Sequence, residues 1–169
     1  MAEFDRAGLL GTIQDLYAAS KDTQAFLHAR FGLGPNVLEP YKATIARSLW
    51  PDLTRNQLPS VAAAKKAIAD YKKAIGQPDG LAELMVFYCE QAVGFGGEYG
   101  FEDEGYFDAL VRMFEQALKA SVTLPAEGRD TMLRRLASVR RIGQRFGYGV
   151  GYDMDHLLAR YARHGEAPE

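Results

Sequence analysis

The sequence contains little cysteine and no long apolar run. Cys89 is the only cysteine among the 169 residues, which excludes an internal disulfide and a metal site built from several cysteines. No apolar run approaches the roughly 18 residues that span a bilayer. The amino-terminal residues lack the basic and apolar regions of a signal peptide. Together these absences predict a cytoplasmic protein without a membrane-spanning segment.

Familiar catalytic and cofactor motifs are also missing. The sequence has no HExxH, no GxSxG and no pair of ExxH motifs, the signatures of metalloproteases, α/β-hydrolases and di-iron bundles. The glycines of residues 147–151 form no nucleotide loop, because no strand pattern precedes them and no GK[ST] follows them. The sequence therefore predicts no cofactor and no metal, and it favours a non-enzymatic role.

The charges are unevenly distributed along the chain. Residues 1–78 carry ten basic and seven acidic side chains, residues 79–128 carry two and ten, and residues 129–169 carry eight and five. The three parts therefore have net charges of +3, −8 and +3, within a total of −2. This order suits a compact domain whose outer parts pair with its middle. It also suits a bipolar surface that recruits one acidic and one basic partner.

Apolar residues recur with helical periodicity, and no segment alternates as a strand does. Length and composition suit one globular domain over residues 1–164, followed by a frayed tail at 165–169. We predict an all-α fold of about eight helices in antiparallel hairpins, arranged as a bundle or a short helical array. The expected helices cover roughly 5–19, 22–31, 38–49, 61–75, 80–95, 103–118, 129–146 and 153–163, with N-caps at Asp22, Ser60, Asp79 and Asp103.

Several segments resemble a known family. Residues 16–32, 41–52, 64–100 and 103–118 are similar to an uncharacterised, all-helical prokaryotic family that is a domain of unknown function. The similarity covers most of residues 9–160, and it implies a single bacterial-type all-α domain. It implies no activity, no cofactor and no catalytic residue.

Residues 94–108 are the most distinctive stretch, because they combine acids, aromatics and glycines without any basic residue. The five acids are Glu98, Glu102, Asp103, Glu104 and Asp108, and the five aromatics are Phe95, Tyr99, Phe101, Tyr106 and Phe107. The spacing of the acids does not match an EF-hand loop. Helix capping by Asp103, with Glu104 in the first helical turn, explains part of the pattern. The alternatives are a surface that binds a partner or a ligand and, less favoured, a metal ion held by converging carboxylates.

We predict from this stretch a protein-binding or regulatory module that engages another protein. Its expected contact residues are Glu90, Glu98, Tyr99, Phe101, Glu102, Glu104 and Tyr106. Acids would steer a basic partner, and aromatic side chains would supply apolar anchors. A rival hypothesis is a small enzyme with Glu90, Glu98, Tyr88 and an arginine from residues 134–145 in a groove between helices. The oligomeric state stays open.

An arginine-rich helix supports a third hypothesis, a module that binds anions or nucleic acid. On a helix, Arg134, Arg141 and Arg145 would lie within about 40° of one another. Such a row could hold phosphates, because each guanidinium can bind two oxygens of an oxyanion. However, the chain is not basic overall and carries no recognition motif. We therefore expect these arginines to face solvent or the acidic middle of the chain, and nucleic acid is disfavoured.

Overall fold

The computed structural model describes residues 6–21, 23–24, 26–27 and 36–162. Over these ranges the chain forms seven α-helices and one short 3-10 helix, with no strand. The predicted all-α fold is therefore confirmed. None of the described helices combines the length and the apolar character that crossing a bilayer requires.

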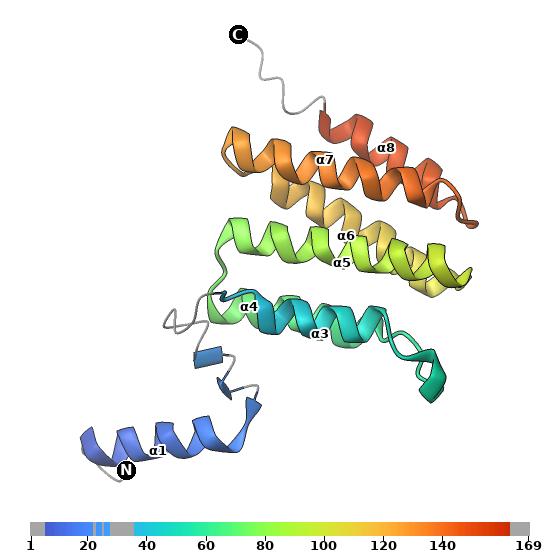
Figure 1. Ribbon diagram of the computed structural model, residues 1–169. Coiled ribbons are helices and arrows are strands. Elements are labelled where there is room, and N and C mark those ends of the chain that lie inside the picture. The colour runs from blue at the N-terminus through green and yellow to red at the C-terminus, as the bar shows by residue number, and fades with distance from the viewer. Residues whose placement is uncertain (1–5, 22, 25, 28–35, 163–169) are drawn as a thin grey trace.

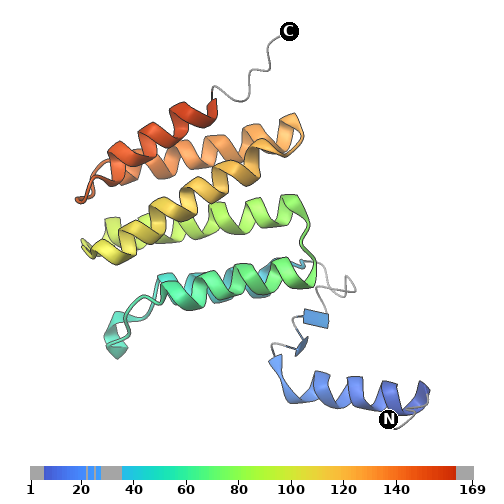
Figure 2. The same ribbon diagram turned by 180° about the vertical axis from the view of Figure 1, so that it is seen from behind.

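Six of the helices form three hairpins that stack in chain order, as Figures 1 and 2 show from opposite sides. Each hairpin packs against the next, and the middle hairpin contacts both of the others. Short connections between neighbours produce this arrangement, because they force consecutive helices to run antiparallel. The hairpins pair α3 (Glu39–Leu49) with α4 (Val61–Ala74), α5 (Pro78–Tyr99) with α6 (Glu104–Val122), and α7 (Ala126–Gly143) with α8 (Val150–Ala162).

The hydrophobic core runs through all three hairpins and is densest around α5 and α6. These two helices contribute most of the large side chains that are fully buried, which follows from their central place in the stack. Cys89 lies in this core, and burial raises the pKa of its thiol well above the usual range. The largest fully buried side chains include Ile45, Leu49, Leu84, Tyr88, Phe95, Phe107, Leu110, Phe114, Leu118, Leu136 and Met154.

The first helix, α1 (Arg6–Ala19), lies apart from this stack (Figures 1 and 2). Its helical range agrees with the prediction, but its apolar face does not join the core. About half of the surface of Leu9, Ile13 and Leu16 is exposed. Of the predicted second helix, residues 23, 24, 26 and 27 are helical, as is residue 21 just before it, whereas its cap at Asp22, residue 25 and its end at 28–31 lie outside the described residues.

The helix α5 extends beyond both of its predicted ends. It begins at Pro78 with Gln77 as N-cap, so Asp79 lies in the first turn and is not the cap. There its carboxylate still favours the positive end of the helix dipole. The helix continues through the glycines of residues 94–97 to Tyr99, and Gly100 ends it in a left-handed conformation with φ +59°. Much of the predicted glycine-rich connection is therefore helical.

The boundary between α7 and α8 also differs from the prediction. The helix α7 ends at Gly143, three residues before the predicted end at Phe146, and the chain continues in tight turns. In these turns the Arg145 N–H donates to the Ile142 carbonyl at 3.1 Å. The helix α8 starts at Val150, inside the glycine-rich segment 147–151. Gly151 fits there because a Cβ would lie 2.8 Å from the Gln144 Cα.

Candidate functional site

The predicted binding stretch forms a surface where α5 ends and α6 begins. We define the acidic aromatic surface as Glu98, Tyr99, Phe101, Glu102 and Glu104. The connection is short because Asp103 caps α6: its Oδ1 accepts a hydrogen bond from the Tyr106 N–H at 2.7 Å. The predicted cap is therefore confirmed. Glu104, the first residue of α6, lies beside the positive end of the helix dipole.

The carboxylates of this surface are available to a partner. Glu98, Glu102 and Glu104 are all exposed. Within the described ranges, none of them makes an ion pair or accepts a side-chain hydrogen bond. Asp108, one turn into α6, differs because Arg112 binds it at 3.3 Å. Three uncompensated negative charges therefore lie at one end of the middle hairpin.

The aromatic side chains of the surface rest on a buried aromatic cluster. Tyr99 is 48% exposed, and its ring centroid lies 5.1 Å from that of Phe95 and 6.3 Å from that of Trp50. Phe101 is half-buried, with ring centroids 5.3 Å from both Phe95 and Tyr106. These neighbours hold both rings in place. Tyr99 and Phe101 would therefore lose little side-chain entropy when a partner contacts them.

Two predicted contact residues lie away from the surface. Tyr106 is only 4% exposed, and its hydroxyl lies 3.3 Å from the Ala92 carbonyl, to which it donates. Burial raises the pKa of this hydroxyl, so it stays protonated. Tyr106 therefore supports Phe101 from beneath and cannot contact a partner directly. Glu90 lies two turns earlier on α5 and binds Arg135 of α7.

Arg135 is the centre of a charge network that joins three helices. Its guanidinium binds both Glu90 oxygens at 2.7 Å and also binds Glu83. Lys42 of α3 binds Glu83 from the other side at 2.5 Å. Burial alone would raise the pKa of Glu83, but the hydrogen bonds from Arg135 and Lys42 outweigh it, and the pKa is lowered. Two cations and two carboxylates neutralise one another here.

This network bears on two predictions. An arginine of the arginine-rich helix does bind the acidic middle of the chain, as expected, but it is Arg135 and not a member of the predicted row. Of the groups in the enzyme hypothesis, Glu90 and an arginine of residues 134–145, Arg135, do meet. The other two do not join them at a common site, because Tyr88 is 1% exposed and Glu98 faces solvent. Burial raises the pKa of Tyr88 above its usual range.

The predicted arginine row is interrupted in the structure. Arg134 and Arg141 are exposed on α7, whereas Arg145 lies in the turn after Gly143, where helical spacing no longer applies. Arg134 donates to Thr131 Oγ1 at 3.2 Å. The other arginines of this helix are engaged: Arg140, for instance, binds Asp155 of α8. The helix α7 therefore does not present three guanidiniums in one straight row.

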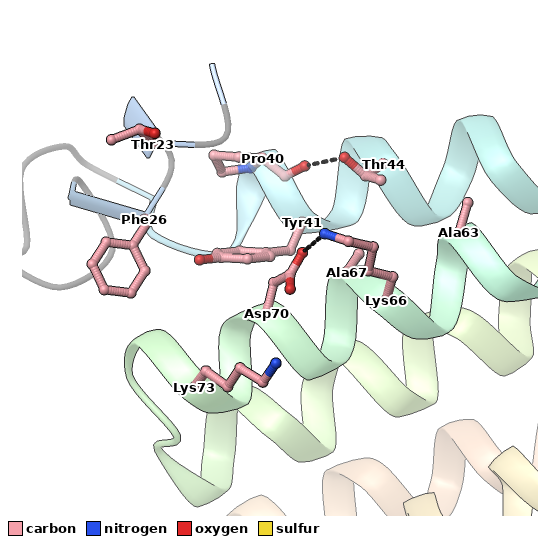
Figure 3. Close-up of a pocket in the computed structure, with 10 residues that line it drawn as sticks. All are labelled: Thr23, Phe26, Pro40, Tyr41, Thr44, Ala63, Lys66, Ala67, Asp70 and Lys73. Carbon is pink, nitrogen blue, oxygen red and sulfur yellow. Dashed lines mark hydrogen bonds and ion pairs between the residues drawn. The ribbon is translucent and has the colours of Figure 1, made fainter. Parts of the chain in front are cut away.

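Two hollows lie elsewhere on the molecule, and sequence reasoning found neither. A cavity of about 460 Å³ is bounded by Tyr71, Asp79, Glu83 and Met132, among others. Its Glu83 is already neutralised, as described above, and burial raises the pKa of Tyr71. A larger groove of about 540 Å³ lies along the outer side of the first hairpin, between α3 and α4 (Figure 3). Both hollows combine residues far apart in sequence, so no local motif could signal them.

Metal ligands and relatives give no further indication of function. In the part of the chain that the structure describes, no three His, Cys, Asp or Glu side chains gather as a metal site would require. Comparisons with known protein families, with curated proteins and with solved structures find no match. The resemblance to a helical prokaryotic family therefore stays a prediction, and the candidate site stands on its own geometry.

Proposed function

We propose that this chain is a helical binding module that captures a basic partner protein through the acidic aromatic surface. One observation carries the proposal: exposed carboxylates without ion pairs flank in sequence a half-exposed tyrosine, which packs on a buried aromatic side chain. Such a surface steers a cationic partner by its charge and then holds it by apolar contact. Tyr99 is the central anchor, because tyrosines are enriched among the residues that dominate binding energies.

The test uses charge reversal on the surface. Immobilised protein is exposed to an array of Lys- and Arg-rich peptides that also contain aromatic residues, and dissociation constants are measured for those that bind. Changing Glu102→Lys together with Glu104→Lys should weaken binding at least about tenfold, because two attractive charges become repulsive. Tyr99→Ala should weaken it by about tenfold as well, through the loss of an apolar anchor.

A matched control separates this surface from net charge. Glu127→Lys with Asp130→Lys changes the total charge by the same amount, also in the first turns of a helix, but on α7. Both residues are exposed and neither belongs to the acidic aromatic surface. Binding should stay within about twofold of the wild type in this variant. An array without any binder, or equal losses in both double variants, would contradict the proposed function.

A further inference from the structure

The groove of the first hairpin has the shape of a docking site for a helix. Its floor is built from small side chains, Thr44 of α3 and Ala63 and Ala67 of α4, which would let another helix approach closely. From Ala63 to Lys73 the wall formed by α4 is about 15 Å long along the helix axis, which matches roughly three turns of a bound helix. The ten lining residues are Thr23, Phe26, Pro40, Tyr41, Thr44, Ala63, Lys66, Ala67, Asp70 and Lys73 (Figure 3).

Apolar surface is exposed at one end of this groove. Phe26 projects beside the groove in Figure 3, and 45% of its surface is exposed. Tyr41 forms part of the floor, where its ring packs edge-on against Tyr71 at a centroid distance of 5.3 Å. An occupant with an apolar stripe would therefore contact a firm base and one exposed aromatic ring.

The charges at the rim determine what kind of helix fits. Lys73 lies on the same side of α4 as Asp70 (Figure 3), and it makes no ion pair with any described residue. Asp70, the acid of the groove wall, is bound by Lys66 at 2.6 Å. On α3, Arg47 does not line the groove, but it lies 3.5 Å from Oγ1 of the lining residue Thr44 and contacts no described carboxylate. The charged residues that line the groove are Lys66, Asp70 and Lys73, so its wall carries a net positive charge.

We propose that this groove binds an amphipathic helix with an acidic flank, supplied by a partner protein. The apolar stripe of that helix would cover the floor, and its carboxylates would meet Lys73. The chain's own α1 lacks this character, because its charged residues are one base, Arg6, and one acid, Asp15. The site is separate from the acidic aromatic surface, so the module would join an acidic partner to a basic one.

The probe is a fluorescein-labelled peptide of about 15 residues with leucines at helical i, i+3, i+7 spacing and glutamates on both flanks. Fluorescence anisotropy measures its binding to the full chain, and the same peptide with lysines in place of glutamates is compared. The acidic peptide should bind, and the basic peptide should bind at least about tenfold more weakly, because the rim is cationic. No binding by the acidic peptide, or equal binding by both, would overturn the proposal.

Two adjacent lysines provide a matched pair of variants. Lys72 and Lys73 are both exposed in the last turn of α4, but only Lys73 lines the groove. Lys73→Glu should weaken binding of the acidic peptide about tenfold, whereas Lys72→Glu should change it by less than about twofold. Ala63→Leu, which fills the floor and keeps the charge, should also weaken binding. Equal effects of the two lysine variants would assign the binding to general charge and refute the groove.

Other occupants are distinguished in the same experiment. If α1 itself filled the groove, cysteines introduced by Ile13→Cys and Thr44→Cys would form a disulfide within one monomer, and the peptide would compete with it. If the groove bound a membrane, vesicles rich in phosphatidylserine would bind more strongly than the peptide and would be sensitive to Lys73→Glu. Either result would overturn the proposed helix-binding site.

Discussion

The position of the Trp50 side chain depends on Gly94, which carries a hydrogen atom in place of a side chain. A Cβ at Gly94 would lie 2.5 Å from the Trp50 Cζ3, far inside van der Waals contact. The absence of that Cβ lets the indole ring lie against α5, where it also contacts Phe95 and Tyr99. Gly94 therefore serves close packing within α5.

We expect Gly94→Ala to displace the indole ring of Trp50. Overpacking of this kind destabilises a protein by about 1–3 kcal/mol. Trp50 is the only tryptophan, so intrinsic fluorescence should report the displacement as a changed emission maximum. Binding through Tyr99 should weaken as well, because the tyrosine loses a supporting ring.

Gly97→Ala is the control in the same helix. A Cβ at Gly97 would lie 3.6 Å from Ile142 Cγ2, an ordinary contact. This variant should stabilise the protein by about 0.5–1 kcal/mol, because alanine favours a helix over glycine. Tryptophan emission should not change. An unchanged spectrum for Gly94→Ala would show that Trp50 does not pack against α5 in solution.

At the scale of elements, ion pairs connect helices that belong to different hairpins. Lys42 on α3 and Arg135 on α7 both bind Glu83 on α5, so all three hairpins are joined through one carboxylate. Arg160 of α8 binds Glu115 of α6 in the same manner. These pairs match the basic–acidic–basic order of the sequence, in which the outer parts of the chain pair with its middle.

Replacing Arg135 should remove the ion pairs that join α7 to α5 and so destabilise the fold. We expect Arg135→Gln to lower the free energy of unfolding at pH 7 by about 1–2 kcal/mol, because charged hydrogen bonds are lost at a partly exposed site. Arg134→Gln should change it by less than about 0.5 kcal/mol, since Arg134 binds no described carboxylate. Urea denaturation measures both values.

The effect of Arg135→Gln should depend on pH. The pKa of Glu83 is lowered in the folded state, so the stability it contributes is present above its unfolded pKa, and it is lost as pH falls through the lower folded value. The difference between wild type and Arg135→Gln should therefore shrink below about pH 4.5. A difference that is constant down to pH 3 would rule out the ion pairs as its source.

Over the residues that the structure describes, the molecule contains a stack of three hairpins and one helix, α1, that does not join it. The three hairpins share one hydrophobic core, whereas α1 stands apart with several large apolar side chains exposed. A single helix of this length is marginally stable in water. Its contribution to the stability of the stack should consequently be small.

Substitutions in α1 and in the stack should therefore differ sharply in effect. Ile13→Lys should change the free energy of unfolding by less than about 0.5 kcal/mol, because this side chain is about half exposed. Ile45→Ala, at a fully buried position of α3, should cost about 2–5 kcal/mol. Urea denaturation followed by circular dichroism provides the comparison. A large loss for Ile13→Lys would mean that α1 packs against the stack in solution.

Local patterns in the sequence were sufficient for most of the helices. Apolar spacing and the caps Ser60 and Asp103 located α4 and α6, since both signals depend on neighbours within one or two turns. The ends of α5 and α7 were placed several residues away from where they occur. Near those ends, glycines such as Gly96 and Gly143 pack against side chains from other helices, and no local pattern contains that information.

The sequence by itself determined the all-α class, the antiparallel hairpins and the position of an acidic aromatic stretch. Only the tertiary structure decided which members of that stretch are exposed: it buries Tyr106, leaves Tyr99 at the surface and assigns Glu90 to Arg135. It also created the groove between α3 and α4. The physical reason is the distance along the sequence over which each property is decided. Helix formation depends on nearby residues, whereas burial, ion pairing and grooves depend on how separate helices pack.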